Sequence, residues 1–219
     1  MKKLFLITLL LAILGVSCVP VNSSSPTGPV ILLTTTPTPG EITLSDDAGV
    51  LSGVPCQAPC FYGIIAGQTR SVDVLNILNQ NGVVNCIEYD TYLNCAGAGI
   101  YFNEQFVSTI GFQPQTPIPL KKLLDRFGPP DHIAVIDRTF MADVPVIDVY
   151  FYYDDKHMVF ASGQHQGTTV KLNEDVLIYC WNYFDASSYQ ADLSIWQASG
   201  DSAFPSRVFD WEGYGNYSP

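Results

Sequence analysis

Apolar residues recur at helical spacing in two stretches of the chain. In the first stretch, Val74, Ile77 and Leu78 follow Thr69, a residue type favoured at the N-cap, and Asn81-Gly82 supplies a helix end. We therefore predict a helix between Thr69 and Asn81.

The second stretch has clearer boundaries. Pro119 suits the first position of a helix, Gly128 suits the position that follows the last turn, and Pro129-Pro130 cannot continue a helix. Between them, apolar residues repeat at i, i+3, i+4 and i+7: Leu120, Leu123, Leu124 and Phe127. This pattern predicts a short amphipathic helix.

The remaining apolar runs are rich in β-branched and aromatic residues and are separated by turn residues. We predict strands over 83–92, 100–102, 104–112, 133–137, 146–153, 158–162 and 176–184. A helix followed by strands, twice over, indicates an α+β fold with two helices packed on one face of antiparallel sheet, in two tandem helix-plus-meander units or in one.

The N-terminus has the layout of an export signal. Lys2 and Lys3 precede an apolar core over 4–14, and small residues then lead to Cys18. The apolar core is too short for a stable membrane span. We predict a signal peptide over 1–17.

The last five residues of this signal, Leu14-Gly15-Val16-Ser17-Cys18, resemble the lipobox of bacterial lipoproteins, although Gly15 stands where leucine is usual. The resemblance implies that Cys18 is diacylated and becomes the new N-terminus. Two acyl chains would hold the protein on the extracytoplasmic face of a membrane. The alternative is an ordinary secretory signal in which Cys18 is incidental.

Composition divides the mature chain into three parts. Residues 18–52 are rich in Ser, Thr, Pro and Gly, which is typical of a tether, although the apolar run 30–33 is also compatible with a docked strand. Residues 53–190 carry the patterns of a globular α+β domain. Residues 191–219 form an aromatic C-terminal segment that we expect to pack on this domain.

The chain is acidic. Its net charge of −11 becomes −13 when Lys2 and Lys3 leave with the signal peptide. Phosphate backbones and anionic lipids repel such a chain, so the charge disfavours nucleic acid as a partner and leaves membrane attachment to the lipid.

Cysteines outside the cytoplasm are expected to form disulfides. The spacing predicts one disulfide between Cys56 and Cys60 and another, across a hairpin, between Cys86 and Cys95. Cys180 is then left over in an apolar run, where a buried inert thiol is favoured over an intermolecular bond. Neither the spacing nor the nearby histidines fit a redox or metal site.

The helix boundaries carry a second resemblance. Gly67-Gln68-Thr69 at a helix start, and Phe127-Gly128-Pro129-Pro130-Asp131 leading into a strand, resemble the corresponding segments of BamE/SmpA-type lipoprotein domains. The resemblance, which extends to the tandem units of β-lactamase inhibitory protein, implies two helices against a three-stranded sheet and action through a surface. Residues 53–64 also resemble a module of uncharacterised Chloroflexi-type lipoproteins, from which no role follows.

No catalytic constellation is evident in the sequence. Asp154, Asp155 and His157 come nearest to a metal or catalytic cluster, but a polar hairpin turn explains them better. His132, His157 and His165 are not accompanied by the Gly-x-Ser-x-Gly motif of a hydrolase. We therefore expect no enzyme, metal or cofactor. An unrecognised hydrolase would need a pocket that gathers a histidine and a carboxylate.

Aromatic residues crowd the C-terminal segment, and they are the sequence's best candidates for recognition: Trp196, Phe209, Trp211 and Tyr214. Aromatic side chains are favoured at binding surfaces, although they also complete ordinary cores. The first hypothesis is a non-catalytic lipoprotein that presents a surface to another envelope protein. The second is a module that binds a glycan or small ligand through these aromatics.

Overall fold

The computed structural model describes residues 47–95, 97–139, 144–198 and 205–219. All of them belong to one compact unit, Thr35–Pro219. The predicted signal peptide, the predicted lipidation site Cys18 and the predicted tether as far as residue 46 lie outside the described residues. Within the described ranges, no helix has both the length and the apolar character needed to cross a membrane.

The described helices are short. They are α2 (Val74–Gln80), α3 (Leu120–Phe127) and α4 (Ala186–Ala198), with the 3-10 turns η2 (Ser71–Asp73) and η4 (Asp154–Lys156). The strands are β1 (Cys60–Phe61), β2 (Ile64–Ile65), β3 (Cys86–Glu88), β4 (Tyr92–Cys95), β5 (Ala98–Asn103), β6 (Phe106–Phe112), β7 (Ile118–Pro119), β8 (His132–Asp137), β9 (Val146–Tyr153), β10 (Met158–Ser162), β11 (His165–Gln166), β12 (Val170–Leu172), β13 (Leu177–Phe184), β14 (Ser206–Asp210) and β15 (Gly215–Tyr217).

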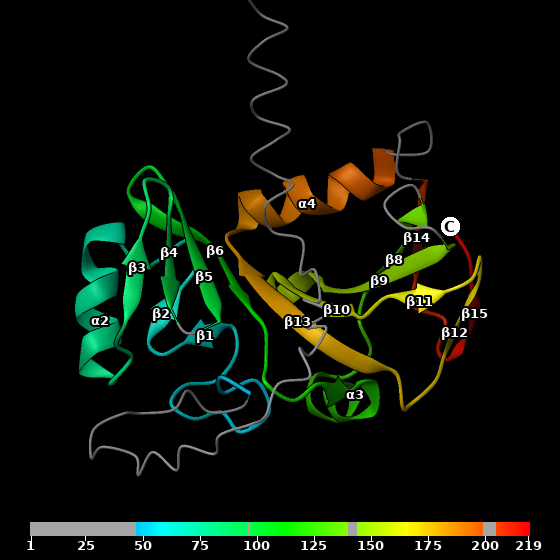
Figure 1. Ribbon diagram of the computed structural model, residues 1–219, viewed down its shortest axis with the longest axis horizontal. Helices are drawn as coiled ribbons and strands as arrows, with labels where there is room; N and C mark the ends of the chain where they lie inside the picture. The colour runs from blue at the N-terminus through cyan, green and yellow to red at the C-terminus, as the bar shows by residue number, and fades with distance from the viewer. Residues whose placement is uncertain (1–46, 96, 140–143, 199–204) are drawn as a thin grey trace, which may run out of the picture. The chain divides into compact units, whose positions relative to one another are not determined.

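One large sheet organises these elements (Figure 1). It has 11 strands, and its main path runs β14-β8-β9-β10-β13-β6-β5-β4-β3, with every pairing antiparallel. β11 adds to β9, and β7 adds to β13. The sheet therefore begins at a strand from the C-terminal segment and ends at β3.

The predicted α+β fold with two helices on one face is wrong. Strands hold 41% of the described residues and helices 22%, so the molecule is mainly β. The strands expected to form separate meanders join through β6 and β13 into one sheet. The arrangement implied by the BamE/SmpA resemblance, two helices against three strands, is not the one observed.

The third helix, α4, was not predicted, and it lies across the sheet from α3 (Figure 1). Its only buried residues are Tyr189 and Leu193, so it lacks the apolar stripe by which the other helices were recognised. Because α4 covers the opposite face, helices lie on both sides of the sheet.

Different residues pack on the two faces of the sheet, because neighbouring side chains of a strand point to opposite sides. On β9, Val149 and Phe151 enter the main core, into which α2 and α3 also pack. Tyr150 and Tyr152 belong to a second cluster with Tyr189 of α4. We call these sides the core face and the α4 face.

The C-terminal end of α3 was predicted correctly, whereas the N-terminal start of α2 was not. Gly128 follows α3 with a φ of +80°, and its N–H donates to the Leu124 carbonyl at 2.9 Å, as a terminating glycine should. Thr69 does not cap a helix; its hydroxyl accepts the Ile65 N–H at 2.9 Å, and α2 begins only at Val74. The Thr69 hydroxyl is therefore used in a hydrogen bond within the preceding turn and does not cap a helix.

Both predicted disulfides are confirmed. Cys56 and Cys60 are joined across a Cα separation of 5.7 Å, and Cys86 and Cys95 face each other on β3 and β4 at 4.3 Å. Cys180 is fully buried, as its apolar surroundings predict, but the expectation of a free thiol is wrong because Cys180 is also disulfide-bonded. None of the five cysteines in the described part of the chain is free.

The core reaches into the end of the predicted tether. Ala48 and Val50 are fully buried. The Asp47 carboxylate accepts the backbone N–H groups of Gly49, Leu51 and Ser52 at 3.0, 2.9 and 2.8 Å. Burial by itself would raise the pKa of Asp47, but these hydrogen bonds outweigh it, and the pKa is lowered. A well-ordered turn therefore precedes residue 53.

Candidate functional site

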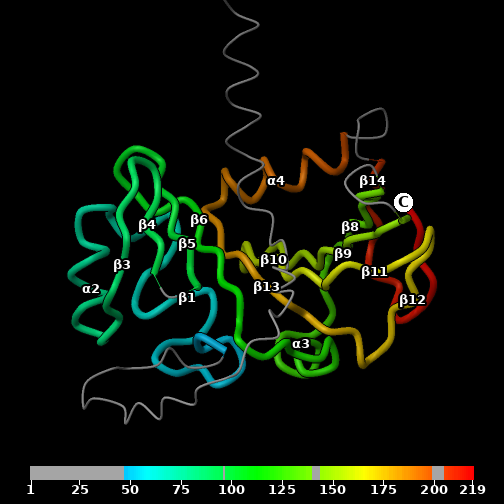
Figure 2. The backbone as a smooth tube through the Cα atoms, viewed as in Figure 1, coloured from blue at the N-terminus to red at the C-terminus, as the bar shows by residue number. Residues whose placement is uncertain are grey.

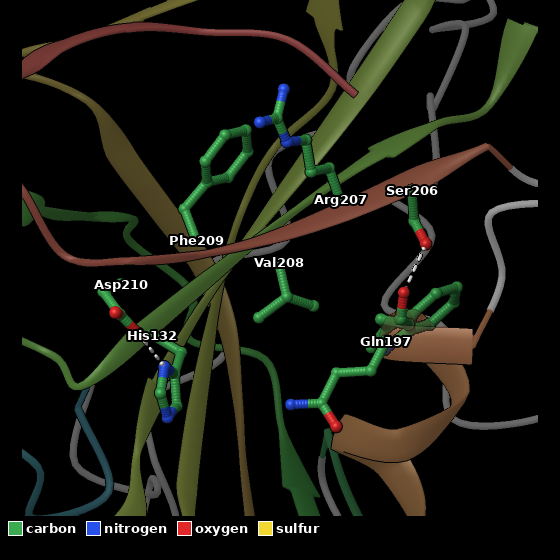
Figure 3. A pocket seen from close by; sticks show the side chains of 8 residues that line it. His132, Gln197, Ser206, Arg207, Val208, Phe209 and Asp210 are labelled. Atoms are coloured by element: carbon green, nitrogen blue, oxygen red, sulfur yellow. Dashed lines mark hydrogen bonds and ion pairs between the residues drawn. The ribbon is translucent and has the colours of Figure 1, made fainter.

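A pocket of about 340 Å³ lies between the end of α4 and strand β14 (Figure 3). It is lined by His132, Trp196, Gln197, Ser206, Arg207, Val208, Phe209 and Asp210. Small-molecule sites usually occupy a few hundred cubic ångströms or more, so this pocket suits a small ligand.

The pairing of β14 with β8 decides which side chains face this pocket. Ser206, Val208 and Asp210 lie opposite Ile136, Ala134 and His132 in the register. These alternate residues point toward α4, whereas Arg207 and Phe209 point to the other side of β14 (Figure 3). The wall of the pocket is therefore polar at Ser206 and Asp210 and apolar at Val208.

His132 is held between two carboxylates at one end of the pocket. Its Nδ1 lies 3.0 Å from Asp210 Oδ1, and its Nε2 lies 3.3 Å from Asp154 Oδ2. Both ring nitrogens of His132 therefore face a carboxylate oxygen. The side chain of Asp210 is 89% exposed, so this carboxylate keeps acceptor capacity for a molecule in the pocket.

Two tyrosine–carboxylate hydrogen bonds join α4 to the elements beneath it. The Tyr189 hydroxyl donates to Asp154 at 2.6 Å, and the Tyr152 hydroxyl donates to Asp192 at 2.7 Å. Burial raises the pKa of Asp192, although hydrogen bonds from Tyr152 and Trp196 act in the opposite direction. Burial, with a contribution from Asp192, also holds the pKa of Tyr152 well above its usual value.

Trp196 lies beside a buried ion pair. Arg138 Nε is 3.2 Å from Asp148 Oδ2, with side-chain exposures of 7% and 17%. The Arg138 guanidinium lies 5.4 Å from the Trp196 ring centre, and Tyr150 stacks on that ring at 6.0 Å. Burial is the main cause that raises the pKa of Tyr150 to about 12, so its hydroxyl stays protonated. Trp196 thus contacts both the pocket and the layer beneath α4.

The pocket does gather a histidine and a carboxylate, the condition set for a hydrolase, but among its described lining residues no hydroxyl is placed beside the imidazole to act as a nucleophile. Both ring nitrogens of His132 already face carboxylates. Ser206 lies four residues along β14 from Asp210, a span of about 13 Å in a strand. Its hydroxyl donates to the Trp196 carbonyl at 2.8 Å. The geometry therefore lacks the hydroxyl–imidazole contact that nucleophilic catalysis uses.

The four aromatic residues that the sequence suggested for binding lie in different places in the structure. Trp196 and Phe209 both line the pocket, but the Phe209 ring turns away from it, contacts Tyr217 at 5.5 Å and lies under the Arg207 guanidinium at 4.7 Å. Trp211 lies 6.2 Å from Phe151 of the core, and exposed Tyr214 contacts Trp211 at 6.1 Å. The four rings do not form one surface.

Sequence reasoning did not single out Gln197 and Asp210, and it considered His132 only as a candidate hydrolase base, without this pocket. Their signal is tertiary, because β14 must pair with β8 before Asp210 comes opposite His132. The predicted turn cluster separates as well: Asp154 joins the His132 network, while Asp155 pairs with Lys156. Among the described residues, no group of three or more His, Cys, Asp or Glu is placed to hold a metal ion.

No family model, no curated protein and no solved structure matches this chain.

Proposed function

We propose that this protein is a lipid-anchored, extracytoplasmic binding module without catalytic activity, and that it binds a small neutral carbohydrate or polyol in the pocket between α4 and β14. The observation that carries the proposal is the convergence of Gln197, Asp210 and His132 around an apolar wall at Val208. An amide and a carboxylate offer the donors and acceptors that hydroxyl groups of a sugar need.

Charge favours a neutral ligand over an anion. Two carboxylates, Asp154 and Asp210, face the single imidazole of His132, which gives this end of the pocket a surplus of negative charge, and the whole chain has a net charge of −11. An anionic ligand would meet repulsion from Asp210. Trp196 adds an aromatic surface of the type that contacts the apolar faces of sugar rings.

A glycan array probed with the mature protein tests the proposal. We expect Gln197→Ala and Asp210→Asn each to weaken binding of the best sugar about tenfold, because each removes hydrogen bonds to the ligand. Tyr214→Ala, which changes an exposed aromatic residue that does not line the pocket, should leave binding unchanged. Absence of any sugar ligand, or equal weakening by all three variants, would contradict the proposal.

The anchor is proposed from the lipobox-like segment alone. Cys18→Ala should release the protein from membranes into the soluble fraction, because one residue carries both acyl chains. Intact-mass measurement should show a diacylglycerol thioether on Cys18. Since that bond uses the Cys18 sulfur, a lipidated Cys18 is unable to form a disulfide, and a peptide map that joins Cys180 to Cys18 would contradict the anchor.

A further inference from the structure

Three tyrosines stack on one another in the region of β3, β4 and β5. These strands form the end of the sheet opposite to β14 (Figure 2). The rings of Tyr89 and Tyr92 are 4.4 Å apart and almost parallel, with an angle of 8°. Tyr92 and Tyr101 follow at 5.3 Å and 21°. We call these three residues the tyrosine stack.

The register of β3, β4 and β5 places the tyrosine stack on a single face. Tyr92 lies directly opposite Tyr101, and the Tyr89 N–H bonds the Tyr92 carbonyl at 2.9 Å across the hairpin turn. The alternate residues Leu93 and Ile100 point into the main core. The tyrosine stack is therefore on the α4 face, but beyond the helix itself.

No described helix packs on this part of the α4 face. α2 packs on the core face through Val74 and Leu78, and α4 contacts β13 and β14. Tyr89 is 44% exposed, and neighbouring Ile87 is 58% exposed. One face of the Tyr89 ring is stacked on Tyr92, which leaves the other face for contact with a partner.

The stack is also rigidly supported. The Cys86–Cys95 disulfide ties β3 to β4 immediately beside it. Gly99, beneath Tyr101, has no side chain; a Cβ atom there would approach the Tyr101 ring to 3.0 Å. A glycine at this position lets the ring lie flat along the sheet. Preorganised aromatic side chains lose little conformational entropy on binding.

The charged residues of the chain segment that forms β3, β4, β5 and β6 have one sign. Residues 83–112 contain Glu88, Asp90 and Glu104 and no lysine, arginine or histidine. Asp90 occupies the turn between Tyr89 and Tyr92. A positively charged partner on this face would meet the Asp90 carboxylate and the open face of the Tyr89 ring, which attracts cations.

We propose that the tyrosine stack and the adjacent Asp90 carboxylate form a docking surface for a polypeptide segment rich in lysine and arginine. Tyr92 has a ring on each of its faces, and Tyr101 stacks on Tyr92 and lies over Gly99, so the surface offers ring edges, hydroxyls and the open face of Tyr89. That combination suits cationic side chains and backbone groups better than successive sugar rings, which need several open aromatic faces. The inference is independent of the ligand in the pocket.

Fluorescence anisotropy with a short labelled peptide of alternating arginine and glycine tests this inference on the mature protein. Tyr89→Ser should weaken binding about three- to tenfold, and Asp90→Asn about two- to threefold. The matched controls are Tyr214→Ser, at a tyrosine that is 49% exposed, and Glu212→Gln, and both should bind as the unmodified protein does. A peptide of alternating glutamate and glycine should not bind.

Equal weakening by Tyr89→Ser and Tyr214→Ser would overturn the inference, because it would show general attraction to an acidic chain. Unchanged binding in Tyr89→Ser would overturn it as well. Unchanged melting temperatures of all four variants would establish that lost binding does not come from unfolding. A neutral oligosaccharide that binds in place of the arginine peptide, and is lost in Tyr89→Ser, would assign the surface to sugars instead.

Discussion

The α4 face of the sheet uses tyrosines in two different ways. Under α4, Tyr152 on the sheet and Tyr189 on the helix are buried and donate to Asp192 and Asp154. At the far end of the same face, Tyr89, Tyr92 and Tyr101 stack on each other and none of them is fully buried. The same residue type serves the attachment of a helix at one end and leaves an accessible aromatic surface at the other.

The two groups of tyrosines differ in the groups that their hydroxyls and rings contact. A buried hydroxyl must be paired, so the tyrosines beneath α4 are tied to carboxylates and fix the helix in place. In the tyrosine stack, the rings contact one another, while water remains available to the hydroxyls. Burial in one half therefore favours stability, and exposure in the other favours binding.

The largest expected effect is a difference in the free energy of unfolding between two variants, one at a tyrosine of α4 and one in the tyrosine stack. Tyr189→Ala should lower the free energy of unfolding by about 3–5 kcal/mol, since it removes a fully buried ring and leaves Asp154 without its donor. Tyr89→Ala should cost about 0.5 kcal/mol, as expected for a surface residue. Urea unfolding of both variants measures the difference, and similar losses would refute the contrast.

The next effect concerns the support of the open half. Replacing Cys86 and Cys95 together by alanine should lower the free energy of unfolding by about 2–3 kcal/mol, because the disulfide closes a loop of about ten residues in the unfolded chain. Arginine-peptide binding should weaken with it. The Cys56/Cys60 double alanine variant is the matched control, and its peptide affinity should be unchanged in the same anisotropy measurement.

A smaller effect depends on pH and belongs to the half that contains β9. Burial lowers the pKa of His165 from its ordinary value of 6.5, and its Nε2 lies 2.9 Å from the Ser162 hydroxyl. The unfolded chain therefore takes up this proton first, and stability falls as pH decreases below about 6.5. His165→Gln should remove this part of the pH dependence in melting temperatures recorded from pH 7.5 to 5; an unchanged profile would exclude His165 as its cause.

The smallest effect tests the geometry of the tyrosine stack. Gly99→Ala places a methyl group against the Tyr101 ring, which must move away. We expect a loss of about 1 kcal/mol or less, a reduced near-ultraviolet circular dichroism signal of the stacked tyrosines, and weaker peptide binding. Unaltered dichroism would show that the ring does not need the glycine.

Local sequence patterns predicted individual elements better than their arrangement. The strands over 146–153 and 158–162 were predicted with the bounds of β9 and β10, because dense aromatic and β-branched runs end at clear turns. Gly128 and both disulfides were also identified correctly. In contrast, α4 was missed, since the residues that attach it to the sheet are tyrosine and aspartate as well as leucine.

The candidate site was predicted only in part, and for a related reason. Aromatic content pointed to Trp196 and Phe209, which do line the pocket, and also to Trp211 and Tyr214, which do not. The polar residues gave no signal, because His132 and Asp210 are 78 residues apart and meet only through strand pairing. The stacking of Tyr92 on Tyr101 was equally invisible before the register was known.

By itself, the sequence determined the acidic charge, the cysteine pairs of the two short loops, most strands and the end of α3, because each depends on residues close together in the chain. Tertiary structure alone decided that the strands join in one sheet, that α4 covers only part of one face, and that His132 lies between Asp154 and Asp210. These features depend on register and on long-range pairing, in which a shift of one residue would turn each side chain to the opposite face.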